Sequence, residues 1–169
     1  MTTTLKADRI LPSAARIDDT LTLPFELRQR SRLVVALDGG REILLALPRG
    51  SVLRHGALLG TSDHTVVQVR AAPETLSVVT SSDPLALARA AYHLGNRHVP
   101  LQIDQGGLAY GHDHVLDDMV RGLGLAIEVV ERPFEPEDGA YKGHTAHDHT
   151  HDHDHGHSHD HDHDHDHHH

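Results

Sequence analysis

The stretch TLSVVTSSDPLALARAAYHLG, residues 75–95, contains the change of pattern that decides the fold. Its first six residues are rich in β-branched side chains, which is typical of a strand. Asp83 and Pro84 then indicate a helix start, since aspartate caps free backbone N–H groups and proline suits the first helical position. The apolar residues expected on one helical face are Leu87, Ala88, Ala91 and Leu94. Gly95 is expected to end this helix.

The chain beyond this helix continues to alternate between strand and helix. VPLQI (99–103) and GLAY (107–110) predict the two strands of a hairpin, and AIEVVERPF (126–134) predicts a last strand. Between them lies a second amphipathic helix, whose apolar positions are Leu116, Met119, Val120 and Leu123. The order β-α-β-β-α-β over residues 74–136 is that of the ferredoxin-like fold.

The residues before this segment predict a small β domain over residues 1–72. RLVVAL (32–37), REILLAL (41–47) and HTVVQVRAA (64–72) read as short strands separated by glycine and proline turns. The predicted fold class is therefore α+β, with an N-terminal β domain, a ferredoxin-like βαββαβ domain and a histidine-rich tail.

Residues 137–169 form the predicted tail, which is rich in histidine and aspartate and has few apolar residues. It cannot offset the cost of ordering a backbone, about 1 to 2 kcal/mol per residue, so we expect disorder without a ligand. Histidine alternates with aspartate here, unlike a purification tag, although the last three histidines alone resemble one. The candidate metal ligands of the tail are His144, His147, His149, His151, His153, His155, His157, His159, His161, His163, His165, His167, His168 and His169.

The composition restricts the possible partners. Residues 144–169 contain seven of the 25 acidic residues and no Lys or Arg, so the rest of the chain has 18 acidic and 15 basic residues and no excess of positive charge for nucleic acid. Without cysteine, any metal must be held by nitrogen and oxygen atoms. The N-terminus lacks the apolar run of a secretory signal and no stretch is long enough to cross a membrane, so a soluble, cytoplasmic protein is expected.

An alternating His-Asp tract is a ligand for late divalent metals. Most free imidazoles are neutral at pH 7 and able to coordinate, and the Irving–Williams order favours Cu(II), then Ni(II) and Zn(II). A flexible tract does not choose among these ions.

His98, in GNRHVPLQID (95–104), lies where the first helix meets the following strand. One imidazole is too few for a stable site. In a homodimer with two-fold symmetry the same residue occurs twice, and two symmetry-related imidazoles could share an ion. The alternative is an ordinary histidine at a helix end or on the surface.

The other histidines before the tail differ in their spacing. His112 and His114 form an H-x-H pair, whose side chains point the same way in an extended segment but diverge in a helix. His93 precedes the GNRH histidine by five residues. His55 and His64 have no partner nearby in sequence and are expected to be surface residues.

Four stretches resemble the UreE-type urease accessory proteins, which are nickel metallochaperones. They are LPRGSVLRHGALL (47–59), VRAAPETL (69–76), AYHLGNRHVPLQI (91–103) and GHDHVLDDMVRGLGL (111–125). The resemblance also implies an N-terminal domain like a peptide-binding module and a C-terminal ferredoxin-like domain that dimerises.

The resemblance further implies roles for individual residues. His98 would bind nickel at the dimer interface, His112 and His114 would form a peripheral metal site, and the position of His93 is often a histidine. The implied role is delivery of Ni(II) to the apo-urease assembly complex together with the GTPase UreG, without enzymatic activity.

Two other functions compete with this interpretation. A general metal-storage or detoxification protein would need only the tail. A metal-dependent hydrolase would use the histidines as ligands and Asp113 or Asp117 as a general base. Ligands at element ends and in a tail suit transfer better than turnover, which needs a preorganised, enclosed site.

Overall fold

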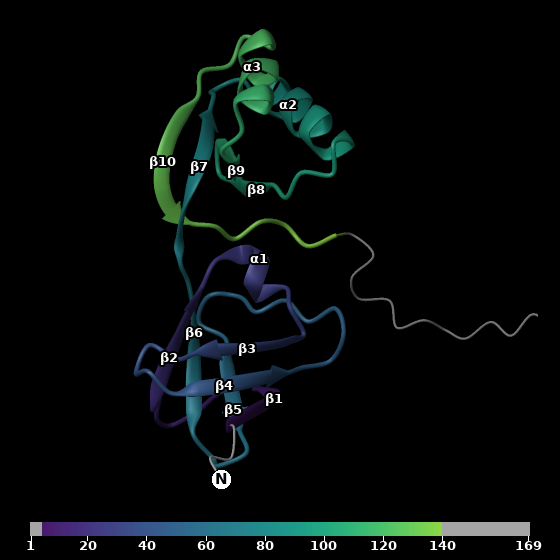
Figure 1. Cartoon of the computed structure of the whole chain (residues 1–169). Coiled ribbons are helices and arrows are strands. Elements are labelled where there is room, and N and C mark those ends of the chain that lie inside the picture. Colours follow the sequence, from purple (N-terminus) through teal and green to yellow (C-terminus); the bar gives the residue numbers. More distant parts are fainter. Residues whose placement is uncertain (1–4, 140–169) are drawn as a thin grey trace, which may run out of the picture. The chain divides into compact units, whose positions relative to one another are not determined.

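The computed structural model describes residues 5–139, which form two β-sheets and three helices (Figure 1). Most of the regular structure is strand, and the mixed α and β class predicted from the sequence is confirmed. The part of the predicted tail from residue 140 onward lies outside the described residues, so the prediction of disorder is not addressed there.

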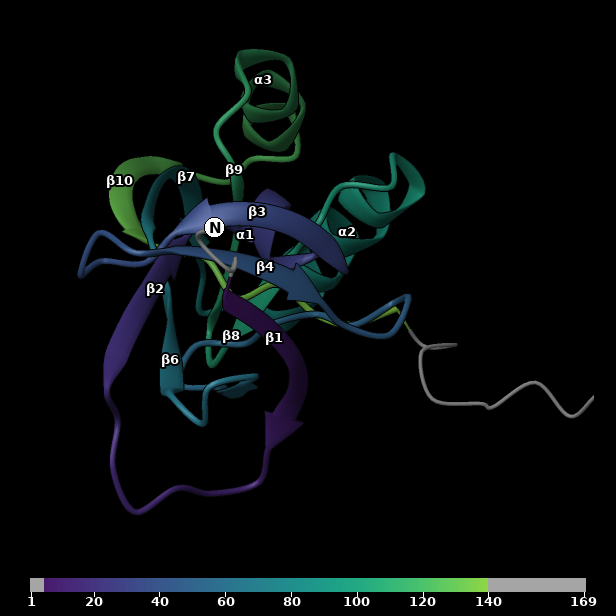
Figure 2. The ribbon, with the colours of Figure 1, turned by 60° about the horizontal axis from the view of Figure 1, so that its bottom comes forward.

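The six-stranded sheet comes first along the chain. Its strands are β1 (Leu5–Leu11), β2 (Asp19–Leu23), β3 (Arg32–Ala36), β4 (Glu42–Ala46), β5 (Leu58–Thr61) and β6 (Val66–Ala71). They lie in the order β2-β6-β5-β1-β4-β3, and Figure 2 shows the antiparallel neighbours β3 and β4 side by side. The core of this sheet includes Leu21, Ile43, Leu45, Leu59, Val67 and Val69.

Three strands of this sheet confirm the segments predicted at 32–37, 41–47 and 64–72, within two residues at each end. The sequence did not reveal β1, where charged residues interrupt the pattern and only Ala7 is fully buried. It also did not reveal α1 (Phe25–Arg28), which is one turn long and too short to show a helical repeat.

The four-stranded sheet follows. Its elements are β7 (Pro73–Thr80), α2 (Pro84–Asn96), β8 (Gln102–Asp104), β9 (Gly107–Gly111), α3 (His114–Gly122) and β10 (Glu128–Pro133). The strands lie in the order β10-β7-β9-β8, and every neighbouring pair is antiparallel. The adjacent strands β7 and β10 are separated along the chain by both helices.

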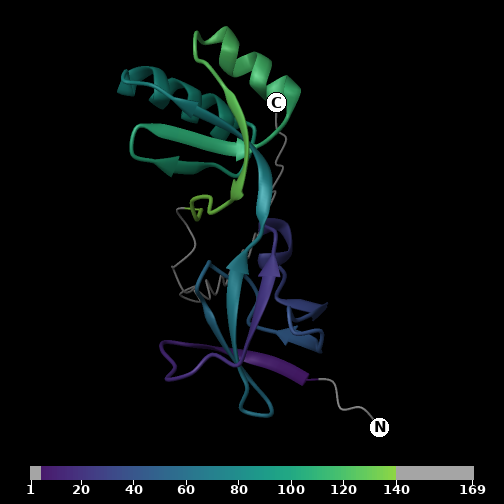
Figure 3. The same ribbon diagram turned by 90° about the vertical axis from the view of Figure 1, so that its left-hand side faces the viewer.

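Both helices pack on one face of this sheet, as Figure 3 shows. Successive side chains of a strand point to opposite faces, so Leu108 and Tyr110 of β9 share the face that the helices cover. They pack with Ala90 and Leu94 of α2 and Val120 of α3. Ser77 of β7, which is paired with Tyr110, lies on the same face.

The predicted start of α2 is confirmed, and its predicted end is one residue too early. The Asp83 carboxylate accepts a hydrogen bond from the backbone N–H of Leu85 at 2.9 Å, and Pro84 is the first helical residue. The helix does not end at Gly95 but runs to Asn96. Glycine is tolerated inside a helix at a modest cost, and the residues after it supply the actual cap.

The predicted apolar face of α2 is wrong at one position. Ala88 is exposed, whereas Ala90 is fully buried. Ala86 also packs against the core of this sheet. The buried face is therefore rotated from the predicted one, which small alanine side chains on several faces of the helix made hard to locate.

The segment after β10 is held by a fully buried arginine, Arg28 of α1. Its guanidinium donates hydrogen bonds to the Phe134 carbonyl and the Glu135 carboxylate, and to the Leu53 carbonyl at 3.1 Å. A buried guanidinium requires such partners, because an unpaired buried charge is strongly unfavourable.

Two residues that the sequence analysis grouped with the tail also make hydrogen bonds. The backbone N–H of Glu137 donates to the Leu101 carbonyl at 2.8 Å, and Asp138 accepts from Arg54 at 2.7 Å. The limits 1–72, 74–136 and 137–169 of the three regions stay a prediction. Among the described residues, none of the helices is long and apolar enough to cross a membrane.

Candidate metal centre

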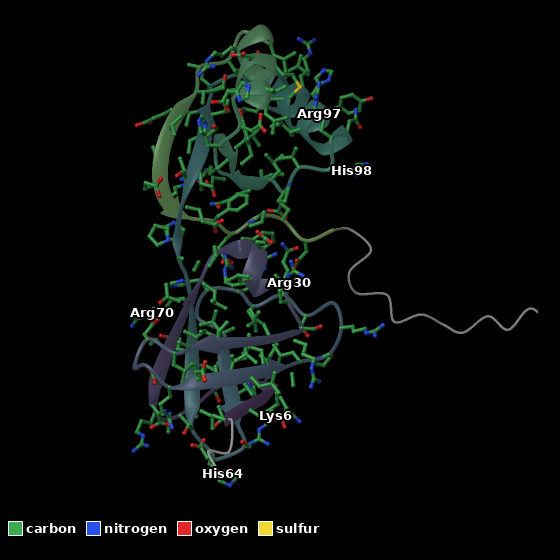
Figure 4. All side chains as sticks on the ribbon, viewed as in Figure 1. Lys6, Arg30, His64, Arg70, Arg97 and His98 are labelled. Carbon is green, nitrogen blue, oxygen red and sulfur yellow. The ribbon has the colours of Figure 1, made fainter. Side chains whose placement is uncertain are left out.

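His98 lies just beyond the C-terminal end of α2, where Figure 4 shows it next to Arg97. Its side chain is exposed and its backbone is left-handed, with φ of 57°. The His98 N–H donates to the Gly95 carbonyl at 2.9 Å, and the Val99 N–H donates to the Leu94 carbonyl at 3.4 Å. This pair of bonds is the Schellman motif that closes many helices.

The left-handed position of a Schellman motif is usually glycine, because a Cβ atom there crowds the backbone. Histidine tolerates this conformation better than most residues, but still at a cost. Val99 packs in the same core as Leu94, which holds the motif in place. The GNRH segment thus presents an imidazole to solvent from a fixed backbone.

His93 lies in the last turn of the same helix and is exposed. Its ring meets the ring of Tyr92 edge-on, with centroids 5.3 Å apart. His93 and His98 therefore both belong to the C-terminal end of α2, where a helix dipole favours positive charge such as a bound cation.

His112 precedes α3, and its ring nitrogen Nδ1 faces two polar groups. It lies 3.2 Å from Oδ2 of Asp117 and 3.0 Å from Oγ of Ser77. Asp117 is 1% exposed and accepts a hydrogen bond from the Tyr110 hydroxyl at 2.8 Å. Burial raises the pKa of Tyr110, so this hydroxyl keeps its proton and remains a donor.

Asp113, between the two histidines of the pair, is the N-cap of α3. Its carboxylate accepts from the backbone N–H groups of Val115 at 2.8 Å and Leu116 at 3.1 Å. These bonds, the one from Leu116 first, lower the pKa of Asp113. His112 lies before this extended residue, and His114 is the first residue of the helix. An extended residue between them is the condition under which both side chains can point the same way.

The remaining histidines of the described chain lie elsewhere. Nδ1 of His55 accepts from the Ala71 N–H at 3.2 Å, and His64 is exposed in the turn between β5 and β6. All fourteen candidate ligands of the tail, from His144 to His169, lie outside the described residues. Within residues 5–139, no group of three or more histidine or acidic side chains is close enough to hold a metal. The described part of a single chain therefore supplies too few ligands at His98 or at His112.

An open pocket of about 410 Å³ lies beside the histidine pair. His112 and Asp113 contribute to its wall together with the apolar side chains of Val99, Pro100 and Leu116. The His112 side chain is 40% exposed. The ring is therefore anchored at Nδ1 and still accessible from outside.

The sequence indicated the histidines but missed Ser77, which contacts His112, and Tyr110, which donates to Asp117. These two residues are directly opposed in the pairing of β7 with β9, although 33 positions separate them along the chain. Asp117 was considered only as a general base. The spacing of five residues from His112 to Asp117 across a helix start was the local signal available.

Comparison with known proteins identifies the family of this chain. Residues 2–72 match the family model described as the N-terminal domain of the UreE urease accessory protein, and residues 74–169 match the model of its C-terminal domain. The chain therefore belongs to the UreE family of urease accessory proteins, which confirms the resemblance noted in the sequence.

Three curated relatives, each named Urease accessory protein UreE, show how close the match is. The protein of Alkalilimnicola ehrlichii is 61% identical over 133 residues, covering 79% of this chain and 82% of the relative. That of Pseudomonas putida strain W619 is 58% identical over 135 residues, covering 79% and 84%. That of Proteus mirabilis is 55% identical over 124 residues, covering 73% and 77%.

Proposed function

We propose that this chain is a nickel metallochaperone that delivers Ni(II) to the apo-urease assembly complex during urease maturation. Membership of the urease accessory family supports the role in urease maturation. In this proposal the protein acts in the cytoplasm as a homodimer, with the GTPase UreG as a partner and without catalysing a reaction itself. Residues 73–133 form a ferredoxin-like domain, supported by the order β7-α2-β8-β9-α3-β10.

The observation that carries the proposal is the placement of His98. It occupies a position that glycine fills at lower cost, and its imidazole is exposed. Residues with such backbone strain cluster at functional sites, and at His98 the strain coincides with the helix end that also carries His93. Two copies related by a two-fold axis would present two imidazoles to one ion, which compensates for the small number of ligands in one protomer.

The chemistry of such a site suits transfer. Neutral imidazoles bind Ni(II) well, and Cu(II) or Zn(II) would bind to the same ligands. Two protein ligands leave several coordination positions of Ni(II) open to water, to His93, or to histidines of the tails. An acceptor protein can then replace these ligands one at a time, without first breaking an enclosed site.

The hydrolase alternative requires a free carboxylate as general base. Both candidates are already engaged, since Asp113 caps α3 and Asp117 accepts a hydrogen bond from Tyr110 and faces His112. This favours metal transfer over hydrolysis. A storage protein needs no partner, whereas the proposed metallochaperone does. Activation of urease therefore distinguishes the two functions.

The test supplies nickel only through this protein. Apo-urease complex and UreG with GTP are mixed with the nickel-loaded chain in the presence of a chelator that removes free Ni(II). The loaded parent should restore urease activity, and the loaded His98→Ala variant should restore much less. If free nickel at the same total concentration activates urease equally well in the chelator, the chain acts only as a store.

A further inference from the structure

The buried carboxylate of Asp117 faces a candidate metal ligand, His112. We infer that Asp117 is a positioning residue that fixes the tautomer of His112, so that Nε2 is the atom that binds the metal. This inference rests on the proposed function for the identity of the cargo. It concerns a residue that is not itself a ligand.

The surroundings of Asp117 hold its two oxygens in different roles. Oδ1 accepts from the Tyr110 hydroxyl at 2.8 Å, while Oδ2 lies 3.2 Å from Nδ1 of His112. A guanidinium nitrogen of Arg121 approaches Oδ2 at 3.9 Å. The carboxylate is 1% exposed, so these side chains replace water around it.

A neutral imidazole has one N–H, and this geometry decides which nitrogen carries it. If Nδ1 were unprotonated, its lone pair would face the buried, negatively charged Oδ2 of Asp117 at 3.2 Å. This contact is unfavourable, because little water screens the charge there. Oγ of Ser77, 3.0 Å from Nδ1, can donate or accept and imposes neither tautomer. The proton therefore stays on Nδ1, on the side of the carboxylate, which leaves the lone pair of Nε2 free.

The other histidine of the pair, His114, differs from His112 in its surroundings. Within residues 5–139, no hydrogen bond to the ring of His114 is found, so its tautomer is not fixed in this way. Ligating histidines commonly donate their other N–H to a carboxylate, which orients the ring and increases its basicity. In the H-x-H pair, His112 therefore has its tautomer fixed before a metal binds, whereas His114 can bind through either ring nitrogen.

Replacing Asp117 by asparagine should reverse the tautomer. The Tyr110 hydroxyl continues to donate to Oδ1, so the carbonyl oxygen of the amide stays on that side. The amide NH₂ then faces His112, where Nδ1 can only accept. The proton moves to Nε2 and blocks the atom that would bind the metal.

Asp118→Asn is the matched control. It makes the same change of side chain at the next residue of α3, whose carboxylate is 75% exposed and pairs with Arg121 at 3.1 Å. The control should therefore keep the parental tautomer and metal affinity.

The experiment uses the full chain labelled with ¹⁵N-histidine. Long-range ¹H–¹⁵N spectra at about pH 8.5, where free imidazoles are neutral, report which nitrogen of His112 is protonated. Zn(II) then serves as a diamagnetic probe, and a chelator buffer fixes its free concentration so that the tail cannot deplete it. The half-saturation concentration is read from the His112 signal, and circular dichroism checks that each variant is folded.

The parent and Asp118→Asn should show a proton on Nδ1, and Asp117→Asn a proton on Nε2. Asp117→Asn should also need about 10- to 100-fold more free Zn(II) for half-saturation. A proton on Nε2 in the parent overturns the inference, even if Asp117→Asn does not fold. An unchanged tautomer or an unchanged half-saturation concentration in folded Asp117→Asn also overturns it. The proposed function is tested separately, since it fails if the His98→Ala variant activates urease as well as its parent.

Discussion

At the scale of single residues, two histidines have the left-handed backbone that glycine adopts at lower cost. They are His98, with φ of 57°, and His64, with φ of 66°. Figure 4 shows them on different elements, with His64 in the turn after β5. The unusual backbone alone is therefore not sufficient to identify a metal ligand. It makes His64 a matched control for every substitution of His98.

His98→Gly should stabilise the protein while removing the proposed shared metal site. Glycine fits the left-handed position of the Schellman motif without a Cβ clash, so the free energy of unfolding should rise by about 1 kcal/mol. His98→Ala should show no such gain, because alanine also has a Cβ atom. Chemical denaturation of the three proteins without metal measures the difference. If His98→Gly is no more stable than His98→Ala, the strain attributed to this position is absent.

At the scale of secondary-structure elements, local signals in the sequence predicted well wherever they were strong. The proline and aspartate at the start of α2 and the β-branched runs of β3, β4 and β6 act within a few residues. Weak segments such as β1 depend on neighbours that are distant in sequence. β1 pairs with β4 and β5, and this pairing does not appear in its own composition.

In the candidate site, too, local signals were predictable and contacts between distant residues were not. His98, His112 and His114 were recognisable from motif spacing, whereas the support for His112 was not. Ser77 and Tyr110 meet only because β7 and β9 pair in one particular register. A single sequence does not specify that register, so the buried residues around a candidate ligand are harder to predict than the candidate ligand itself.

The contact between Asp38 and β2 predicts how the stability of the fold depends on pH. Asp38, beyond the end of β3, accepts hydrogen bonds from the side chains of Thr20 and Thr22 of β2. These bonds, the one from Thr20 first, lower the pKa of Asp38. A lowered folded-state pKa contributes stability that is present above the unfolded value, near 3.9, and is lost as the pH falls through the folded value.

Asp38→Asn should therefore be less stable than the parent at pH 7, and this difference should shrink as the pH falls below about 4. Urea denaturation of both proteins at each pH gives the two free energies of unfolding. Thr22→Val, which removes one donor and keeps the carboxylate, should show a smaller loss at pH 7. A difference between Asp38→Asn and the parent that does not change with pH would contradict this account.

At the scale of the whole molecule, the described body and the histidine-rich tail are expected to have separate roles. Removing residues 144–169 should lower the number of bound Ni(II) ions severalfold, since fourteen histidines are lost with that segment. The body should remain folded, because a tract of this composition contributes ligands but little packing. Equilibrium dialysis and circular dichroism of the full and shortened chains measure both effects. Unfolding of the shortened chain, or loss of all its nickel binding, would contradict this separation.

The central claim is that two copies of His98 hold one nickel ion in a dimer. The most direct measurement is the nickel stoichiometry and affinity of the shortened chain, by isothermal titration calorimetry, with native mass spectrometry of the same samples. The parent and the His64→Ala control should each bind one tight Ni(II) per dimer. His98→Ala should lose that ion and remain a folded dimer. If His98→Ala binds nickel as tightly as the parent, and with the same stoichiometry, the histidine of GNRH is not the shared ligand and the account is wrong.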